Sequence, residues 1–165
     1  MLMMDDLPES ARRVQAALLA AGVETAVVEL PASTRTAQEA ASAIGCEVRQ
    51  IAKSLVFRRK SNGEPVLVVA SGTNRVDEQL VGRHLHDEIE RADPEFVRAA
   101  KGYAIGGVPP LAHITPVTTL IDPDLLTLST IWAAAGTPHA VFSISPEQLV
   151  TATGGLVMPV ARRPG

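Results

Sequence analysis

The sequence predicts an α+β fold, in which helices pack around a single mixed sheet. Two β-rich runs, SLVFRR and PVLVVAS, are separated by KSNGE, whose Asn-Gly pair is a strong hairpin signal. Elsewhere, helical patterns with recognisable first and last residues alternate with strand-like runs. Because these elements lack the regular spacing of βαβ units, we expect hairpins and strand–helix units to share the sheet.

The elements before the hairpin are predicted from local signals. Residues 8–21 have apolar side chains at helical spacing, a proline at the start and a glycine after the end. Residues 24–30 predict a strand that a proline stops. Thr36 is the expected cap of an alanine-rich helix that ends at Gly45, and a helical turn over 47–52 leads into the hairpin.

The elements after the hairpin follow the same logic. Residues 76–85 and 93–100 predict helices, and Asp93 caps the second, with a proline at its first position. Ser145 is the expected cap of a last helix, PEQLVTATG. Further strands are predicted at 116–122, 130–135, 140–145 and 156–161.

The composition indicates one domain with an aliphatic core. The chain has 165 residues, 46% hydrophobic but only 3% aromatic. We expect a flexible tail over residues 1–7 and one domain over residues 8–165. A single cysteine, Cys46, excludes an internal disulfide. The start lacks signal-peptide features, and no apolar run approaches the roughly 20 residues that span a bilayer. A cytoplasmic protein without membrane contact is therefore expected.

The charge balance argues against broad nucleic-acid binding, including DNA. The net charge is -3 and the pI about 5.8, whereas nucleic-acid binders usually carry a basic footprint. Five cations nevertheless lie within twelve residues, and they define a possible local patch: Arg49, Lys53, Arg58, Arg59 and Lys60. The alternative for residues 58–60 is a solvated strand end.

Several familiar catalytic motifs do not occur. The glycines of residues 102–107 do not form a dinucleotide fingerprint, and neither a P-loop nor a nucleophile elbow is present. His84 and His86 are two apart on a predicted helix, so they point to different faces and do not suggest a shared metal. Cys46 fits a small buried residue after a helix end. We therefore expect no metal and no cofactor.

Two features remain as candidate chemistry. Lys53 lies in the largely apolar run IAKSLVF, so its ammonium either extends to solvent or meets an anion such as a phosphate. The loop GYAIGGVPP, residues 102–110, combines glycine freedom with proline rigidity. It is either a structural turn or a nest whose N–H groups at Gly106, Gly107 and Val108 point outward and bind an anion or a carbonyl oxygen. His139 lies at a strand entry, where it lines a pocket or is an ordinary surface histidine.

Three segments in order, IAKSLVFRR, GYAIGGVPP and IWAAAGTPHAVFSISPEQL, resemble the YbaK/EbsC family of aminoacyl-tRNA deacylases. This family is related to the editing domain of bacterial prolyl-tRNA synthetases. TRTAQEAASAIG and PVLVVASGTNRVDE extend the resemblance, which covers nearly the whole chain from about residue 23. The resemblance implies a mixed-sheet domain that hydrolyses the ester of a mischarged tRNA carrying a small amino acid.

The resemblance also implies roles for particular residues. Lys53 matches the family's strand lysine and would contact the 3′-terminal adenosine region of the tRNA. Residues 106–110 match its G-x-x-x-P loop, whose amides would hold the ester carbonyl. The implied catalytic residues are Lys53, Gly106, Gly107, Val108 and Pro110. His139 matches a histidine that shapes the amino-acid pocket. Chain order places the pocket walls near Thr36, Ile51, Ser71, Gly72 and Asn74, and Pro109 and Gly136 complete the expected substrate-binding residues.

The expected partner is the CCA 3′ end of an aminoacyl-tRNA. The acidic pI is compatible with this partner, because binding the 3′ end alone contacts few phosphates. An aminoacyl-tRNA synthetase or elongation factor is an additional expected source of specificity. Two alternatives stay open. One is a non-catalytic aminoacyl-tRNA or nucleotide-binding module with the same fold. The other is a small-ester or nucleotide-phosphate hydrolase that uses the same loop.

Overall fold

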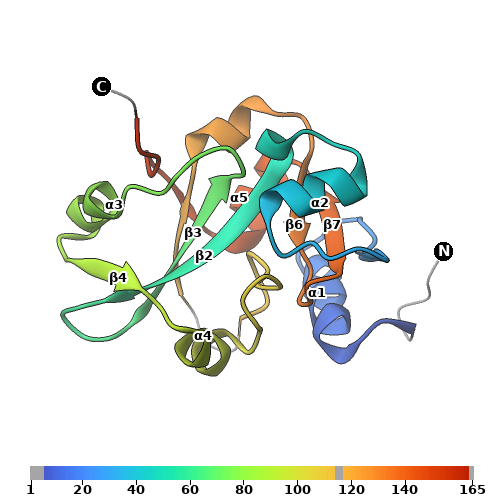
Figure 1. Ribbon diagram of the computed structural model, residues 1–165, viewed down its shortest axis with the longest axis horizontal. Helices are drawn as coiled ribbons and strands as arrows, with labels where there is room; N and C mark the ends of the chain where they lie inside the picture. Colours follow the sequence, from blue (N-terminus) through green and yellow to red (C-terminus); the bar gives the residue numbers. More distant parts are fainter. Residues whose placement is uncertain (1–5, 114–116, 164–165) are drawn as a thin grey trace.

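In residues 6–113 and 117–163, which the computed structural model describes, eight strands form one mixed sheet (Figure 1). Its order is β1-β7-β6-β2-β3-β5-β8, and β4 pairs with β2 beside this path. The strands are β1 (Val28–Glu29), β2 (Ile51–Arg59), β3 (Pro65–Ser71), β4 (Ile89–Arg91), β5 (Thr118–Ile121), β6 (Ile131–Ala134), β7 (Ala140–Ile144) and β8 (Leu156–Val157). The predicted α+β class with one mixed sheet is confirmed.

Helices and turns connect these strands. They are α1 (Glu9–Ala20), α2 (Ala37–Ile44), α3 (Glu78–Leu85), α4 (Pro94–Lys101) and α5 (Pro146–Thr153), with 3-10 turns η2 (Val48–Gln50) and η3 (Pro123–Thr127). The predicted caps are confirmed, because the side chains of Thr36, Asp93 and Ser145 each accept a hydrogen bond from the N–H three residues on.

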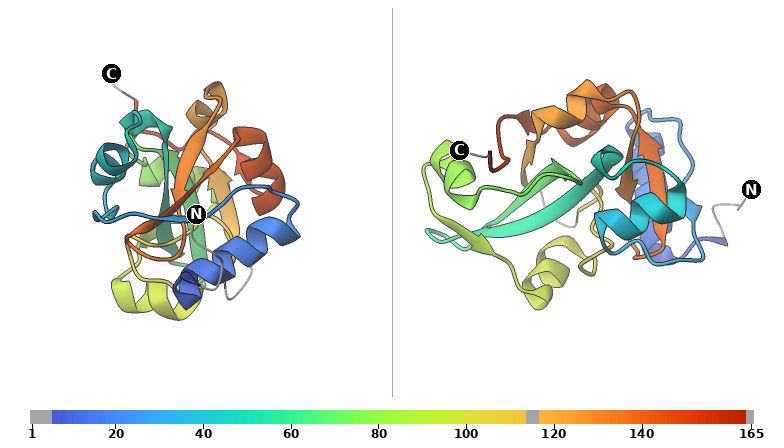
Figure 2. Two further views of the ribbon diagram at one scale, coloured as in Figure 1. Left: turned by 90° about the vertical axis from the view of Figure 1, so that its right-hand side faces the viewer. Right: turned by 45° about the horizontal axis from the view of Figure 1, so that its top comes forward.

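Alternate residues of β2 face two layers of helices. Ile51 packs with Ala40 of α2, and Phe57 packs with Val81 of α3. Ala52, on the other face, belongs to the large core cluster to which α1, α4 and α5 contribute. Figures 1 and 2 show α1 beside β6 and β7 at one end of the sheet, and α3 beside β4 at the other.

The edge of β2 that faces away from β3 pairs with two different strands along its length. β6 pairs with Ile51 and Ala52, and β4 pairs with residues 57–59. Among the described residues, no strand pairs with 53–56 on this edge, while β3 pairs along the opposite edge. The sheet therefore has a local gap beside Lys53 to Val56.

Several element boundaries differ from the predictions. The strand expected at 24–30 is reduced to β1, and the strand expected at 156–161 to β8. β4 and η3 were not predicted; β4 has two charged residues in three, and its pairing with β2 makes it a strand. Of the expected tail, residues 1–5 lie outside the described residues, whereas Leu7 is buried in the core. Residue 116 of the strand expected at 116–122 also lies outside them.

Candidate active site

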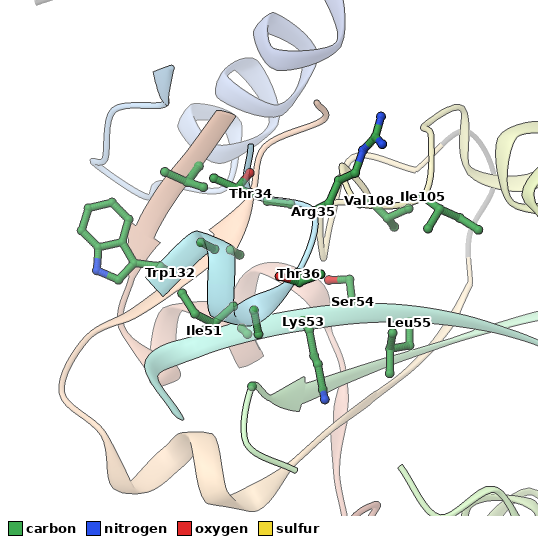
Figure 3. A pocket seen from close by; sticks show the side chains of 18 of the residues that line it. Thr34, Arg35, Thr36, Ile51, Lys53, Ser54, Leu55, Ile105, Val108 and Trp132 are labelled. Atoms are coloured by element: carbon green, nitrogen blue, oxygen red, sulfur yellow. The ribbon is translucent and has the colours of Figure 1, made fainter. Parts of the chain in front are cut away.

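A cavity of about 670 Å³ lies beside the unpaired edge of β2 (Figure 3). Its wall includes residues 51–57 of β2, residues 132–134 of β6, and Ile105, Gly106 and Val108 from the loop after α4. The start of α2 and the end of β4 complete it. Since small-molecule sites typically measure about 300–1,000 Å³, the cavity has room for a nucleoside or an amino acid.

The charged residues of this cavity wall are all cationic. Arg35, Lys53 and Arg91 line it, whereas none of the aspartates or glutamates that the structure describes does so. No ion pair joins these three cations to another described residue. The whole chain has a net charge of -3, so the positive charge here is a local feature. Unpaired cations around a cavity favour an anionic ligand.

Lys53 is partly buried at the gap in the sheet. Burial lowers the pKa of its ammonium; the nearby carboxylate of Asp122 opposes this effect, and Arg75 and Arg91 reinforce it. Asp122 already accepts three hydrogen bonds within the fold. Figure 3 shows the Lys53 side chain on the opposite side of β2 from Val108. A partly desolvated ammonium that forms no ion pair with a described residue is suited to a bound anion.

Two close approaches shape the loop of residues 102–110. Gly106 has φ of +92°, and a Cβ there would lie 2.8 Å from Cγ of Arg35. A Cβ on Gly107 would lie 2.8 Å from both Cα and the carbonyl carbon of Thr137. Only glycine therefore fits without displacement at either position. The Gly136 N–H donates to the Gly107 carbonyl at 2.9 Å, which ties this loop to the turn between β6 and β7.

The three loop amides do not behave alike. The expectation that the N–H of Gly107 points outward is wrong, because it donates to the carbonyl of Ala104 at 3.0 Å. The N–H groups of Gly106 and Val108 have no hydrogen-bond partner among the described residues, and both residues line the cavity. The loop thus offers two free donors rather than three.

The structure brings part of the expected pocket together. Thr36, Ile51 and Gly72 line the cavity with Lys53. The Thr36 hydroxyl is engaged by Glu39, whose N–H donates to it at 3.0 Å. Ile51 is buried and forms apolar wall under α2.

Other expected residues have structural roles and do not line this cavity. The Ser71 hydroxyl donates to the Arg49 carbonyl, and the Asn74 amide donates to the carboxylates of Asp122 and Asp124. Pro109, Pro110 and Gly136 are buried and support the loop. His139 is exposed, with Nδ1 3.2 Å from the carbonyl oxygen of Ala32, so the structure places it outside the cavity wall.

The expected basic patch is largely neutralised. Arg49 pairs with Glu47, Arg59 with Asp87, and Lys60 with Glu88. Arg58 instead stacks over the Phe96 ring at 5.1 Å. Of the five cations in the patch, Lys53 is the one that lines the cavity.

Sequence reasoning missed most residues of the cavity wall. They include Arg35, Ser54, Arg91, Ile105 and Trp132. Their local sequence has no motif that marks them, because strand pairing and loop packing bring them together. The only signal of these residues in the sequence was the positive charge of Arg35, which directly precedes the predicted cap residue Thr36.

No metal centre or membrane segment occurs in the part of the chain that the structure describes. No cluster of three potential ligands from His, Cys, Asp and Glu lies there. Cys46 is partly buried, and burial raises the pKa of its thiol, as befits a packed rather than a reactive residue. None of the described helices has the length and apolar character to cross a bilayer.

Comparisons with known proteins identify the family. The model of the aminoacyl-tRNA editing domain matches residues 31–152, so the chain belongs to this family. The uncharacterized protein YwhH of Bacillus subtilis (strain 168) is 29% identical over 126 residues, 76% of this chain and 80% of YwhH. Proline–tRNA ligase of Limosilactobacillus fermentum is 36% identical over 94 residues, 54% of this chain and 16% of the ligase. A solved structure of a proposed trans-editing enzyme for prolyl-tRNA synthetase is 48% identical, with a TM-score of 0.89, covering 96% of this chain and 100% of that one.

Proposed function

We propose that this protein is a trans-editing hydrolase that deacylates mischarged tRNA carrying a small amino acid. Residues of one cavity wall carry the proposal: the free amides of Gly106 and Val108, and Lys53 at the gap in the sheet, whose ammonium extends on the other side of β2. Membership of the aminoacyl-tRNA editing domain family supports the same substrate class. The names of the two relatives linked to prolyl-tRNA synthesis point to errors of that synthetase.

The amides of Gly106 and Val108 are proposed to stabilise the reacting ester. Water attacks the carbonyl carbon, and negative charge develops on the carbonyl oxygen. An N–H donor about 2.7–3.1 Å from that oxygen stabilises the intermediate, by about 3–4 kcal/mol per donor in a well-studied protease. Collapse of the intermediate breaks the bond to the ribose oxygen, which takes up the proton that the attacking water gives up, and releases the free amino acid and the tRNA. An aminoacyl ester is reactive enough that this route needs no protein nucleophile.

The cations are proposed to hold the 3′ end of the tRNA. Lys53 takes a phosphate at the gap in the sheet, and Arg35 and Arg91 lie on the same cavity wall. Three cations neutralise few phosphates, so binding is expected to depend modestly on salt. Recognition of the tRNA body then requires another source, for which a synthetase or elongation factor is suited.

The apolar wall is proposed to select the amino acid by size. Ile51, Trp132 and Val141 contribute large apolar side chains, and Ala52 and Ala133 small ones. Discrimination by such contacts amounts to about 10- to 200-fold per methylene. Alanine, cysteine and serine are the candidate amino acids.

A panel of charged tRNAs tests this function. tRNAs carrying Ala, Cys, Ser, Thr or Pro are incubated with the protein, and ester loss is compared with the spontaneous rate. We expect at least one small aminoacyl ester to be hydrolysed far above the spontaneous rate, and Lys53→Ala to remove most of that activity. Lys60→Ala is the matched control, because Lys60 is exposed, pairs with Glu88 and lies outside the cavity wall. Spontaneous rates across the panel, or equal activity in both variants, would reject the proposal.

A further inference from the structure

The hydroxyl of Ser54 is a buried polar group without a partner. Its Oγ is inaccessible to solvent and makes no hydrogen bond, although Ser54 lines the cavity. Leaving a buried hydroxyl unsatisfied is unfavourable, so this serine costs stability where it stands. Figure 3 shows its side chain on the side of β2 where Thr36 and Val108 lie, opposite Lys53.

The main chain of Ser54 is also open to the cavity. The Gly72 N–H donates to the Ile51 carbonyl and the Arg59 N–H to the Glu64 carbonyl, so odd-numbered residues of β2 bond to β3. Even-numbered residues therefore direct their N–H and C=O groups to the other edge. There Ala52 lies beside β6, and the Val56 carbonyl accepts from Ala92, but Ser54 falls within the gap.

Ser54 thus presents two acceptors, its carbonyl and hydroxyl oxygens, in the cavity wall, and its side chain lies on the side of β2 where Val108 lies (Figure 3). The free amides of Gly106 and Val108 belong to residues of the same wall, whereas the Lys53 side chain extends from the other side of β2. The other hydroxyl near it, that of Thr36, is already bonded to Glu39. A ligand that hydrogen-bonds to Ser54 therefore needs a donor group, and this group must lie close to the acceptor atom that the amides of Gly106 and Val108 would bind.

We propose that Ser54 binds the α-amino group of the aminoacyl ester, through its main-chain carbonyl and its hydroxyl. This inference rests on the proposed function. In an aminoacyl ester one carbon separates the amine from the carbonyl, so anchoring the amine at β2 fixes the carbonyl toward the loop. Ser54 is a positioning residue in this scheme and transfers no proton. The site then selects esters of free amino acids over acyl groups that lack the amine.

The proposal predicts opposite effects on activity and stability. Ser54→Ala removes the orphan hydroxyl, so the melting temperature stays equal or rises. The same change is expected to lower kcat/KM about tenfold, the loss of one hydrogen bond to a polar or charged group. The remaining carbonyl of residue 54 leaves part of the amine binding in place. Ser54→Thr keeps the hydroxyl and is expected to retain more activity than Ser54→Ala.

A pair of substrates separates this role from a structural one. The aminoacyl-tRNA that the wild type hydrolyses fastest is compared with the acyl-tRNA that lacks only its amino group, for example propionyl-tRNA beside alanyl-tRNA. The wild type is expected to prefer the amine at least tenfold. Ser54→Ala is expected to lose about tenfold on the aminoacyl ester and less than twofold on its deaminated counterpart.

The outcomes distinguish the two proposals. An active wild type, with Ser54→Ala equally impaired on both esters or on neither, would overturn the role of Ser54 alone. A clear fall in the melting temperature of Ser54→Ala would also overturn it, since the hydroxyl would then have a structural partner. A wild type that hydrolyses none of the charged tRNAs would overturn the proposed function, and this inference with it.

Discussion

Replacing Gly107 by alanine tests whether the loop must approach the β6–β7 turn closely. The added Cβ would lie 2.8 Å from two main-chain atoms of Thr137, whereas ordinary contact begins at 3.4 Å. The loop must therefore retreat by about 0.6 Å, because main-chain atoms cannot rotate away. That retreat stretches the bond from the Gly136 N–H to the Gly107 carbonyl, now 2.9 Å, and shifts the neighbouring amide of Val108.

The expected loss of activity follows from this displacement. A misplacement of about 1 Å at a reacting group costs up to about 100-fold, so a shift near 0.6 Å is expected to lower kcat/KM about 10- to 50-fold. Overpacking costs about 1–3 kcal/mol, or roughly 2–12 °C in melting temperature for a domain of this size. Deacylation of the preferred charged tRNA and thermal unfolding measure the two effects.

Gly82→Ala is the matched control for the Gly107 variant. Gly82 lies in α3 and does not line the cavity. A Cβ there would lie 2.6 Å from the main-chain oxygen of Asp87. We expect this variant to lose similar stability but to keep its activity. If Gly107→Ala retained full activity, or lost no more than Gly82→Ala, the loop would be only a structural turn.

Three further variants test the charges around the site. Lys101 is fully buried without a hydrogen-bond partner, and burial lowers its pKa to about 8 from an ordinary 10.5. Between pH 8 and 10.5 the unfolded chain binds more protons than the folded chain, so the free energy of unfolding should rise over this range. Lys101→Met should abolish the rise and increase the free energy of unfolding at pH 7 by about 3 kcal/mol, measured by denaturant titration. An unchanged pH profile in this variant would contradict the explanation. Asp122→Ala leaves the Ser71 N–H and the Asn74 amide without their acceptor, so calorimetry should show the free energy of unfolding lowered by about 2–4 kcal/mol. A melting curve identical to that of the wild type would contradict this. Arg91→Ala should raise KM several-fold and reduce the slope of log KM against log salt by about 1, and a wild-type slope would exclude a phosphate contact.

Local signals predicted the helices well because their determinants lie within one turn. The side chains of Thr36, Asp93 and Ser145 each bond to an N–H three residues away, so each cap is readable from a few letters. The hairpin of β2 and β3 was equally local. The family resemblance then supplied Lys53 and the loop of residues 102–110.

Long-range pairing decided what the sequence could not predict. The gap beside Ser54 exists because β6 and β4 leave β2 at different points, and neither departure has a local signature. The Gly107 amide was misjudged because a turn bond to Ala104 competes with a ligand for it. His139 lies at a strand entry as expected, but the side chain lies against the Ala32 carbonyl, a contact set by packing between distant segments.

A crystal structure with a non-hydrolysable analogue of the aminoacylated 3′ end tests the central claim most directly. An amide in place of the ester, at the terminal adenosine of a short CCA oligonucleotide, keeps the carbonyl intact. We expect its carbonyl oxygen about 2.7–3.1 Å from the N of Gly106 or Val108, with a phosphate oxygen within about 4 Å of Nζ of Lys53. A carbonyl bound elsewhere, with both amides facing solvent, would contradict the account.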